Sequence, residues 1–163
     1  MKMETPTAAI REYRPDDAPA VERCLAELQD FSKLIFPQMA DGAVAPQYLR
    51  HLLAYCGETK GKIFVVEHDA RIVGMVCVFA RIKSSAPDED RYEYAYVSDL
   101  VVLADYRDMG FGRALLKRAE NHARSEGATL LRINVLAKNE VARKLYIADG
   151  FDKYLVSLQK RLG

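Results

Sequence analysis

A short glycine-containing segment, Arg107-Asp108-Met109-Gly110-Phe111-Gly112-Arg113, has the residue types of a phosphate-binding loop. It follows a β-rich stretch and opens a helical pattern, and a helix start offers free backbone N–H groups and the positive end of the helix dipole. Gly110 and Gly112 let the backbone approach an anion closely because they carry no Cβ. Arg113 lies in the first helical turn, where a cation opposes the dipole unless an anion sits in front of it. The segment therefore predicts an anion site, with a plain packing turn as the alternative.

Two other phosphate-binding motifs are excluded by the neighbouring residues. A dinucleotide fingerprint needs a third glycine three residues after Gly112, where this chain has Leu115. The loop of nucleoside triphosphatases needs Gly-Lys before Ser or Thr, but the pair Gly61-Lys62 precedes Ile63. We therefore expect neither of these nucleotide classes as the ligand.

A second motif follows after a predicted helix and strand: Asn139-x-x-Ala142-x-x-Leu145-Tyr146-x-x-x-Gly150-Phe151. Together with Arg107-x-x-Gly110-x-Gly112, it resembles the two motifs of the GNAT N-acetyltransferase superfamily. The preceding Asp99-Leu100-Val101-Val102 is similar to the strand that leads into the family's pyrophosphate loop. The resemblance extends over residues 63–162 and implies a GNAT-like acyl-CoA N-acyltransferase fold with acetyl-CoA as the co-substrate.

The resemblance also implies a role for each matching residue. Backbone groups of Leu100, Val101 and Val102 would pair with the pantetheine arm. The loop residues Arg107, Asp108, Met109, Gly110, Phe111, Gly112 and Arg113 would hold the pyrophosphate, with the Asp108 carboxylate turned to solvent. Asn139 would bond the pantetheine or the nearby phosphate region, and Tyr146 would face the departing sulfur as general acid. Asn139 and Tyr146 are two helical turns apart, so they lie on one face of a helix.

The group that deprotonates an amine acceptor stays open at this stage. An alkyl ammonium has a pKa near ~10.4 and must lose a proton before it attacks. Some GNAT relatives carry a glutamate where this chain has Ser98. Strand alternation places Tyr96 and Ser98 on one face, where they would order a water chain that acts as the base. A β-bulge would reset the alternation and make Asp99 the candidate, and a third possibility is that the tyrosines only pack across strands.

The elements that must position these residues follow from hydrophobic periodicity, β-branched runs and turn residues. Strands are predicted at 9–13, 62–67, 71–82, 91–102, 130–135 and 154–158. A tight turn at His68-Asp69-Ala70 is predicted to join the second and third of these strands. Helices are predicted from Asp17 to about Leu28, over 46–55, over 111–126 and from Asn139 to Gly150, with a loop over 31–45. Gly127 is expected to stop the third helix, and Asn139 to cap the fourth. Hairpins first and a strand–helix–strand crossover later imply an α/β fold (α+β, mixed sheet): a central, mostly antiparallel sheet flanked by helices.

Composition limits the remaining possibilities. The 163 residues suit a single N-acetyltransferase domain over 1–163, and a net charge of +1 argues against a nucleic-acid partner. The longest apolar run, Ile72–Ala80, is far below the ~20 residues that cross a bilayer, and Met1 to Arg14 lack a signal peptide's apolar stretch. The three cysteines form no C-x-x-C pair, so we expect buried thiols in a cytoplasmic setting. The three histidines show no metal-ligand spacing, so no metal is expected.

The resemblance to the GNAT superfamily implies an acetyl-CoA-dependent N-acetyltransferase that acts on a primary amine. The acceptor is a small molecule or a protein amine, and the chain is a possible homodimer. The alternative is an acyl-CoA-binding sensor with little turnover. Phe31, Phe36, Met39 and Tyr48 either belong to the core or form a wall of the acceptor pocket.

Overall fold

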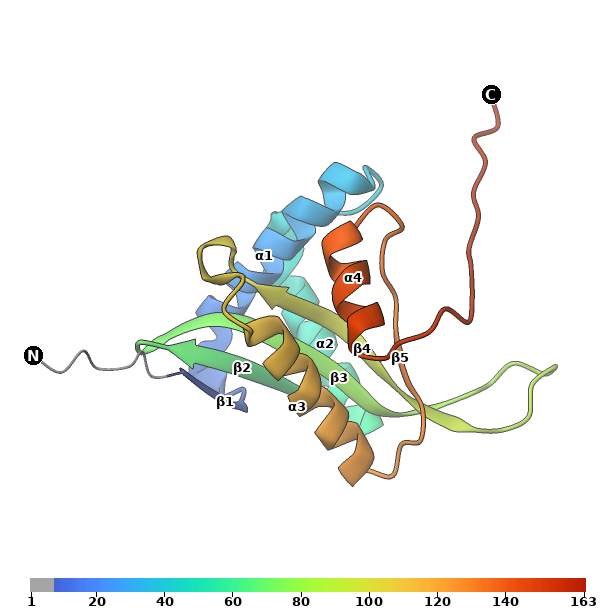
Figure 1. The fold of residues 1–163 in the computed structure, drawn as a ribbon, viewed down its shortest axis with the longest axis horizontal. Coiled ribbons are helices and arrows are strands. Elements are labelled where there is room, and N and C mark those ends of the chain that lie inside the picture. The colour runs from blue at the N-terminus through green and yellow to red at the C-terminus, as the bar shows by residue number, and fades with distance from the viewer. Residues whose placement is uncertain (1–7) are drawn as a thin grey trace, which may run out of the picture.

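The computed structural model describes residues 8–163, which form a five-stranded sheet with helices around it (Figure 1). The strands, in spatial order, are β1 (Ala8–Glu12), β2 (Lys62–His68), β3 (Arg71–Lys83), β4 (Glu93–Val102) and β5 (Leu131–Ile133). The α-helices are α1 (Ala18–Ile35), α2 (Ala45–Thr59), α3 (Phe111–Ser125) and α4 (Glu140–Ala148). Neighbouring strands run antiparallel from β1 to β4, and β5 joins β4 in parallel. The predicted mixed, mostly antiparallel sheet is therefore confirmed.

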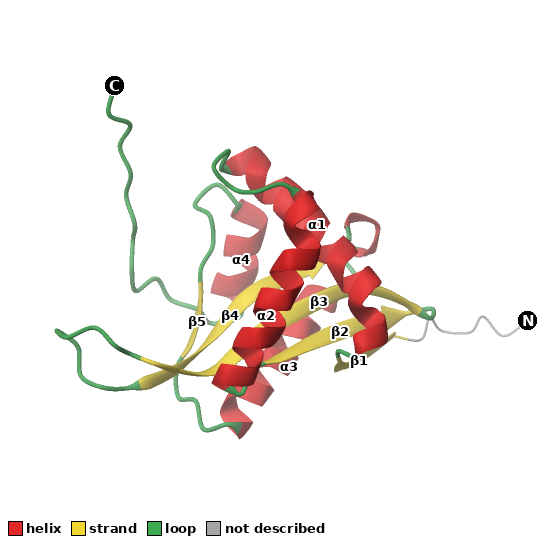
Figure 2. Cartoon of the chain, turned by 180° about the vertical axis from the view of Figure 1, so that it is seen from behind, coloured by secondary structure: helices red, strands yellow, loops and turns green. Residues whose placement is uncertain are grey.

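Helices cover both faces of the sheet. Helices α1 and α2 pack on one face (Figure 2), and α3 crosses the other (Figure 1). Successive side chains of a strand point to opposite faces, so Val65 belongs to the α1/α2 core and Val66 to the α3 core. Tyr146 of α4 is buried in the α3 core, which places α4 on that side of the sheet. None of the helices over residues 8–163 is long and apolar enough to span a membrane.

The hairpin between β2 and β3 is closed by two residues in the left-handed region. Asp69 has φ 48° and Ala70 has φ 61°. Two such residues in a two-residue loop match the backbone twist of a hairpin, and the turn predicted at 68–70 is confirmed. The hairpin places β3 in the middle of the sheet, where eight of its consecutive residues, 73–80, are buried.

Strand β5 stays beside β4 for only three residue pairs, from Ala95↔Leu131 to Val97↔Ile133. Beyond Val97, β4 continues to Val102 while the chain after Ile133 turns toward α4. Residues 98–102 of β4 therefore pair with β3 on one side and, among the described residues, have no strand on the other. This splay leaves backbone N–H and C=O groups open along one edge of β4.

A β-bulge at Ser98 changes which side chains share a face. Val97 pairs with Val78 and Asp99 pairs with Cys77, so Ser98 is an extra residue on β4. Asp99 consequently points to the α1/α2 face, the same face as Tyr96. The simple alternation, which put these two residues on opposite faces, is wrong beyond Val97, and the bulge alternative is confirmed.

Two predicted segments differ from the structure. The strand predicted at Tyr154–Leu158 is wrong, because residues 151–163 form no helix or strand and lead away from the body (Figure 1). Its apolar residues have no sheet partner within residues 8–163. An extended segment becomes a strand only when a neighbour takes its backbone hydrogen bonds. The loop predicted from Phe31 starts later, because α1 continues to Ile35. Helix α1 is capped by Phe36, because the following Pro37 favours extended backbone at that residue.

Candidate active site

A pocket of about 210 Å³ opens where β5 leaves β4. The segment from β5 to α4 forms one side of it and α1, α2 and their connection form the other, while β4 is the floor. The lining residues are Leu28, Gln29, Ser32, Met39, Tyr48, Ser98, Asp99, Leu100, Ile133, Asn134, Val135, Leu136, Asn139, Ala142 and Tyr146. The splay therefore brings five residues that the sequence analysis named as candidate catalytic or cofactor-binding residues into one pocket: Ser98, Asp99, Leu100, Asn139 and Tyr146.

Asp99 is the charged group of this pocket. Its side chain is buried, and Tyr48 Oη of α2 lies 3.1 and 3.0 Å from its two carboxylate oxygens. Burial raises the pKa of Asp99, and the neighbouring hydroxyls of Ser98 and Tyr48 oppose that rise. A carboxylate with a raised pKa accepts a proton more readily than an exposed one, which suits a general base.

Ser98 lies beside this carboxylate on the bulge. Its Oγ is a buried atom that makes no hydrogen bond within residues 8–163. A buried hydroxyl without a partner costs free energy unless a ligand or a water completes it. Ser98 can therefore bind a water or an amine at the pocket floor.

Tyr96 is not part of the pocket lining. Its ring stacks on Phe79 of β3 at 6.4 Å and packs against the α1/α2 core, and burial raises its pKa. The water chain predicted from Tyr96 and Ser98 stays a prediction. The geometry favours Asp99, the alternative that depended on a bulge.

Tyr146 reaches the pocket from α4. The residue is 9% exposed, and its ring contacts that of Phe151 at 5.9 Å. Burial raises the pKa of Tyr146 to about 12, with smaller contributions from Asp99 and Tyr96. The phenol therefore carries its proton at neutral pH and can donate it.

Asn139 is the N-cap residue of α4 and also lines the pocket. Its Oδ1 accepts a hydrogen bond of 3.2 Å from the backbone N–H of Ala142, which confirms the predicted N-cap. The cap uses the side-chain oxygen, so the side-chain NH₂ group is the part of Asn139 left to bind a ligand.

The loop before α3 is built as an anion site requires. Asp108 has φ 60° and Gly110, the N-cap of α3, has φ 83°. These left-handed residues turn the chain so that Phe111, Gly112 and Arg113 begin the helix. The backbone N–H groups of this first turn have no carbonyl of a preceding turn to donate to, so they are free to bind an anion. Asp108, Met109 and Arg113 are exposed, in line with the expectation that the Asp108 carboxylate faces solvent.

Arg107 is the first residue of this loop, and its side chain holds the loop in place. Its Nε donates to the carbonyl of Val102 at 3.1 Å, and its Nη2 lies 3.3 Å from Glu27 Oε1 of α1. Glu27 Oε1 also accepts from the backbone N–H of Ala104 at 2.9 Å. The arginine therefore ties the end of β4, the loop and α1 together.

Gly112 lies where α3 and α4 approach each other. A Cβ added at Gly112 would stand 3.6 Å from Leu145 of α4 and 4.0 Å from Val102 of β4. Val102 faces the α3 core, whereas Val101 is buried in the α1/α2 core. The N-terminal turn of α3, the end of β4 and α4 thus lie close together.

Several pocket residues were not singled out from the sequence. Leu28, Gln29 and Ser32 come from one face of α1, and Gln29 Nε2 donates to the carbonyl of Ala40 at 3.2 Å. Of the four residues considered as core or acceptor wall, Met39 and Tyr48 line the pocket, whereas Phe31 and Phe36 do not. The helical spacing of Leu28 and Ser32 indicates that they share one face of α1. It does not show that this face lines a pocket, because the other lining residues come from elements far away in the sequence.

Comparisons with known proteins agree with this arrangement. A sequence profile of the acetyltransferase (GNAT) family matches residues 25–151. The chain belongs to the GNAT family, whose members catalyse acetyl-CoA-dependent acetylation.

Individual relatives extend the comparison. The uncharacterized N-acetyltransferase YycN of Bacillus subtilis is 33% identical over 91 residues, which is 56% of this chain and 54% of YycN. The chain thus matches about half the length of that relative. The tetramutant BH1408 protein of Bacillus halodurans has a TM-score of 0.82 at 18% identity and covers 94% of this chain and 99% of its own.

A second solved structure is the aminoglycoside N-acetyltransferase AAC(6')-Iy in complex with CoA. Its TM-score is 0.73 at 13% identity, over 99% of this chain and 100% of its own. At these identities, the two structural likenesses show a shared fold.

Proposed function

We propose that the chain is an N-acetyltransferase that transfers the acetyl group of acetyl-CoA to a primary amine. The observation that carries this proposal is one pocket in which the splayed edge of β4, the buried Asp99 and the protonated Tyr146 meet. The glycine-containing start of α3 lies at the other end of the same edge.

The residues present fit acetyl-CoA, which supplies an activated acetyl thioester. The open backbone groups of Leu100, Val101 and Val102 would pair with the amides of the pantetheine arm, as an added strand would. The N–H groups of 108–113 would hold the pyrophosphate at the positive end of α3. The NH₂ group of Asn139 would bond the arm from the opposite side.

Asp99 would remove the proton from the ammonium form of the acceptor. Its carboxylate lies on the pocket floor next to Ser98, and Tyr48 fixes its orientation. A buried carboxylate attracts a cation strongly because little water screens it. Among the described residues that line the pocket, Asp99 is the only Asp or Glu and there is no Lys or Arg, which favours a cationic amine as acceptor.

Tyr146 would give its proton to the sulfur that leaves. A thiol has a pKa near ~8.5, so a neighbouring phenol that donates as the carbon–sulfur bond breaks avoids the release of a bare thiolate. Asp99 and Tyr146 reach the pocket from β4 and α4, two elements on either side of the splay. Base and acid therefore approach the reacting carbon from different sides.

A screen of amines that follows the release of free CoA thiol tests this function. The panel should include small polyamines, aminoglycosides, lysine peptides and peptides with free N-termini. Release with at least one amine supports the enzyme, and release that the Asp99→Asn variant loses supports the site. Tight CoA binding with no release from any amine would favour the sensor alternative. We place the activity in the cytoplasm, where free thiols such as those of this chain persist.

We further propose that the chain forms a homodimer through its C-terminal segment, residues 152–162, called the tail below. Its apolar residues Tyr154, Leu155, Val156, Leu158 and Leu162 are 62% to 90% exposed. Strand β5 is an edge of the sheet, and near the start of the tail the Tyr154 ring lies 4.5 Å from the Arg132 guanidinium of β5. Within residues 8–163, neither the tail nor the outer edge of β5 is paired with a strand, and exchange of tails between two copies would pair both.

A further inference from the structure

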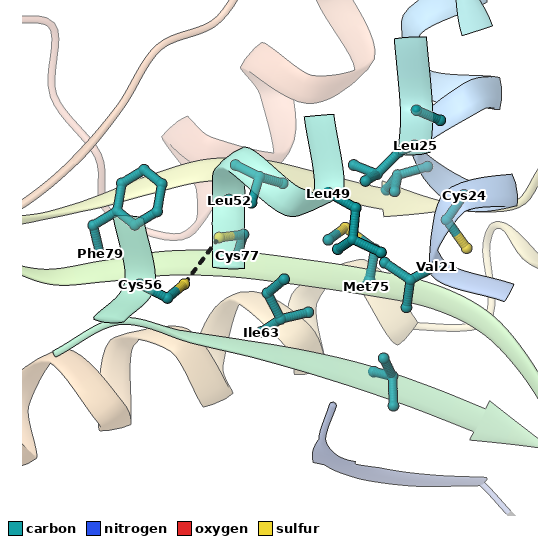
Figure 3. Close-up of a cluster of buried hydrophobic side chains, with 13 residues drawn as sticks. Val21, Cys24, Leu25, Leu49, Leu52, Cys56, Ile63, Met75, Cys77 and Phe79 are labelled. Carbon is teal, nitrogen blue, oxygen red and sulfur yellow. Dashed lines mark hydrogen bonds between the residues drawn. The ribbon is translucent and has the colours of Figure 1, made fainter. Parts of the chain in front are cut away.

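Two cysteine sulfurs touch inside the core between α2 and the sheet. Cys56 Sγ of α2 lies 3.7 Å from Cys77 Sγ of β3 (Figure 3). Cys56 is 8% exposed and Cys77 is fully buried. The third cysteine, Cys24 of α1, is buried in the same core.

The backbone at this point allows the two elements to approach closely. Gly61 follows α2, and its N–H donates to the carbonyl of Cys56 at 2.8 Å. A Cβ built on Gly61 would stand 2.7 Å from the Val78 carbonyl oxygen and 3.0 Å from Cys56 Cα. The missing side chain therefore lets the end of α2 lie against β3, beside the strand position of Cys77.

We propose that Cys56 and Cys77 form a redox modification site at which a hydroperoxide converts the two thiols into a disulfide. A disulfide needs its sulfurs at ~2.05 Å, so the sulfur atoms must approach by a little under half of their present separation. The pair lies 21 positions apart in the sequence, and the link would join α2 to the central strand.

The chemistry balances with the hydroperoxide as the oxidant. Cys56 sulfur attacks one peroxide oxygen, the O–O bond breaks, and Cys56 becomes a sulfenic acid while water or an alcohol leaves with the thiol proton. Cys77 sulfur then attacks the Cys56 sulfur, the S–O bond breaks, and the hydroxyl leaves as water with the second thiol proton. The two sulfurs lose two electrons, which the peroxide gains.

The environment assigns the order of these steps. The hydrogen bond with Cys77 lowers the pKa of the Cys56 thiol, whereas burial raises that of Cys77. The thiolate is the nucleophile, and Cys56 is also the more exposed of the two. Cys56 is therefore the attacking sulfur and Cys77 the resolving one.

The link would act on the candidate base, and this consequence rests on the proposed function. Cys77 is the register partner of Asp99, and α2 carries both Cys56 and Tyr48. A shift of α2 against β3 displaces the Tyr48 hydroxyl from its 3.0 Å contact with Asp99. Oxidation should therefore lower acetyl transfer by about tenfold, the loss expected for one hydrogen bond.

Peptide mapping of the full native chain tests the covalent step without reference to acetyl transfer. The protein is treated with hydrogen peroxide, free thiols are alkylated in denaturant, and the digest is examined by mass spectrometry. The expected product is a linked pair of peptides with Cys56 and Cys77, with Cys24 alkylated and the link reversed by a reductant. The proposal would be overturned if Cys56 and Cys77 of the native chain were still free to be alkylated after a dose of peroxide that oxidises the denatured chain. So would over-oxidation of Cys56 without a link.

Two variants separate the roles. In Cys77→Ala, Cys56 should stop at the sulfenic acid and react with a dimedone probe, whereas Cys56→Ala should give no probe signal. In the activity assay, peroxide should slow the native chain reversibly and leave Cys56→Ala at its own untreated rate. A disulfide without a change in rate would overturn the effect on Asp99, while absence of acetyl transfer in untreated protein would concern the proposed function instead. If a variant does not fold, the mapping of the native chain decides the covalent step.

Discussion

Tyr48 of α2 holds both carboxylate oxygens of Asp99 of β4, 51 positions further along the chain, with its single hydroxyl. The contact crosses the core between the helix layer and the sheet. It exists because the bulge at Ser98 turns Asp99 toward α2 rather than toward α3. The position of the candidate base therefore depends on one extra residue in one strand.

The first prediction concerns Asp99 as the base. Asp99→Asn keeps the size of the side chain and an oxygen for Tyr48 but cannot accept a proton, so kcat should fall by ~10²–10⁴-fold. The matched control Glu93→Gln, an exposed carboxylate on the same strand, should keep the native rate. Equal rates for Asp99→Asn and the native chain under conditions where chemistry limits turnover would contradict the assignment.

Tyr48→Phe tests how the base is held. The Tyr48 hydrogen bond favours the charged form of Asp99, so its removal should raise the pKa of that carboxyl further. The acid limb of the pH–rate profile, which rises as Asp99 loses its proton, should then move to higher pH. A lower rate with an unmoved limb would mean that Tyr48 only supports packing.

A third prediction follows from the stability cost of the same carboxylate. Burial raises the pKa of Asp99 in the folded chain above its ordinary value of 3.8. The protonated side chain therefore makes its full contribution to the free energy of unfolding below pH 3.8, and this contribution is lost as pH rises through the pKa of the folded state. Asp99→Asn should therefore be at least as stable as the native chain at neutral pH, and the difference should shrink toward pH 3.8. Urea denaturation of both proteins at several pH values measures this. The prediction would be contradicted if the stability of Asp99→Asn, measured relative to the native chain, were lower at neutral pH than at acid pH.

The fourth prediction concerns Tyr146. Tyr146→Phe removes only the hydroxyl, so CoA affinity and the melting temperature should stay nearly unchanged while kcat falls by ~10²–10⁴-fold. Acyl donors with a better leaving group should show a smaller loss, because their thiolate needs less help from an acid. Tyr55→Phe, which packs on Phe79 on the other face of the sheet, is the matched control. Native turnover by Tyr146→Phe would assign the proton to another donor.

The fifth prediction addresses acetyl-CoA itself. CoA at a hundredfold excess over its Kd should stabilise the native state by ~2.7 kcal/mol and raise the melting temperature. Gly112→Glu should abolish the shift, because its side chain starts 3.6 Å from Leu145 and carries a negative charge into the pyrophosphate route. Gly57→Glu is the control, since nothing lies within 4 Å of a Cβ at that exposed helical position. A native melting curve that ignores millimolar CoA would remove the basis of the site.

Light scattering tests the proposed exchange of tails. The full chain should have the mass of a dimer, and a chain that ends at Asp152 should be a monomer. Leu158→Asp should also dissociate the dimer, because it places a charge in the paired segment, whereas Leu34→Asp, at an equally exposed apolar residue of α1, should not. A monomeric full-length chain would mean that the tail pairs with its own β5 or with nothing.

Local signals in the sequence predicted much of the fold correctly. The turn at Asp69-Ala70, the cap at Asn139 and the helix stop at Gly127, which has φ 90°, each depend on a few neighbouring residues. The bulge at Ser98 depends instead on how β4 aligns with β3, which no local pattern records. The pocket wall from α1 likewise arises from the packing of distant elements. The strand predicted in the tail was wrong for a related reason, since the apolar Leu155 and the β-branched Val156 have no strand beside them in the part of the chain that the structure describes.

The short pairing between β4 and β5 also has a consequence for hydrogen exchange. Only three residue pairs hold β5 to the rest of the sheet, so β5, α4 and the tail form the part that can open at the lowest free energy. Amides of 131–148 should therefore exchange with solvent by a local opening, well before those of β2 and β3, which open only on global unfolding. A ligand that bridges the gap would join the two parts into one cooperative unit, and the protection of α4 would rise to that of the central strands.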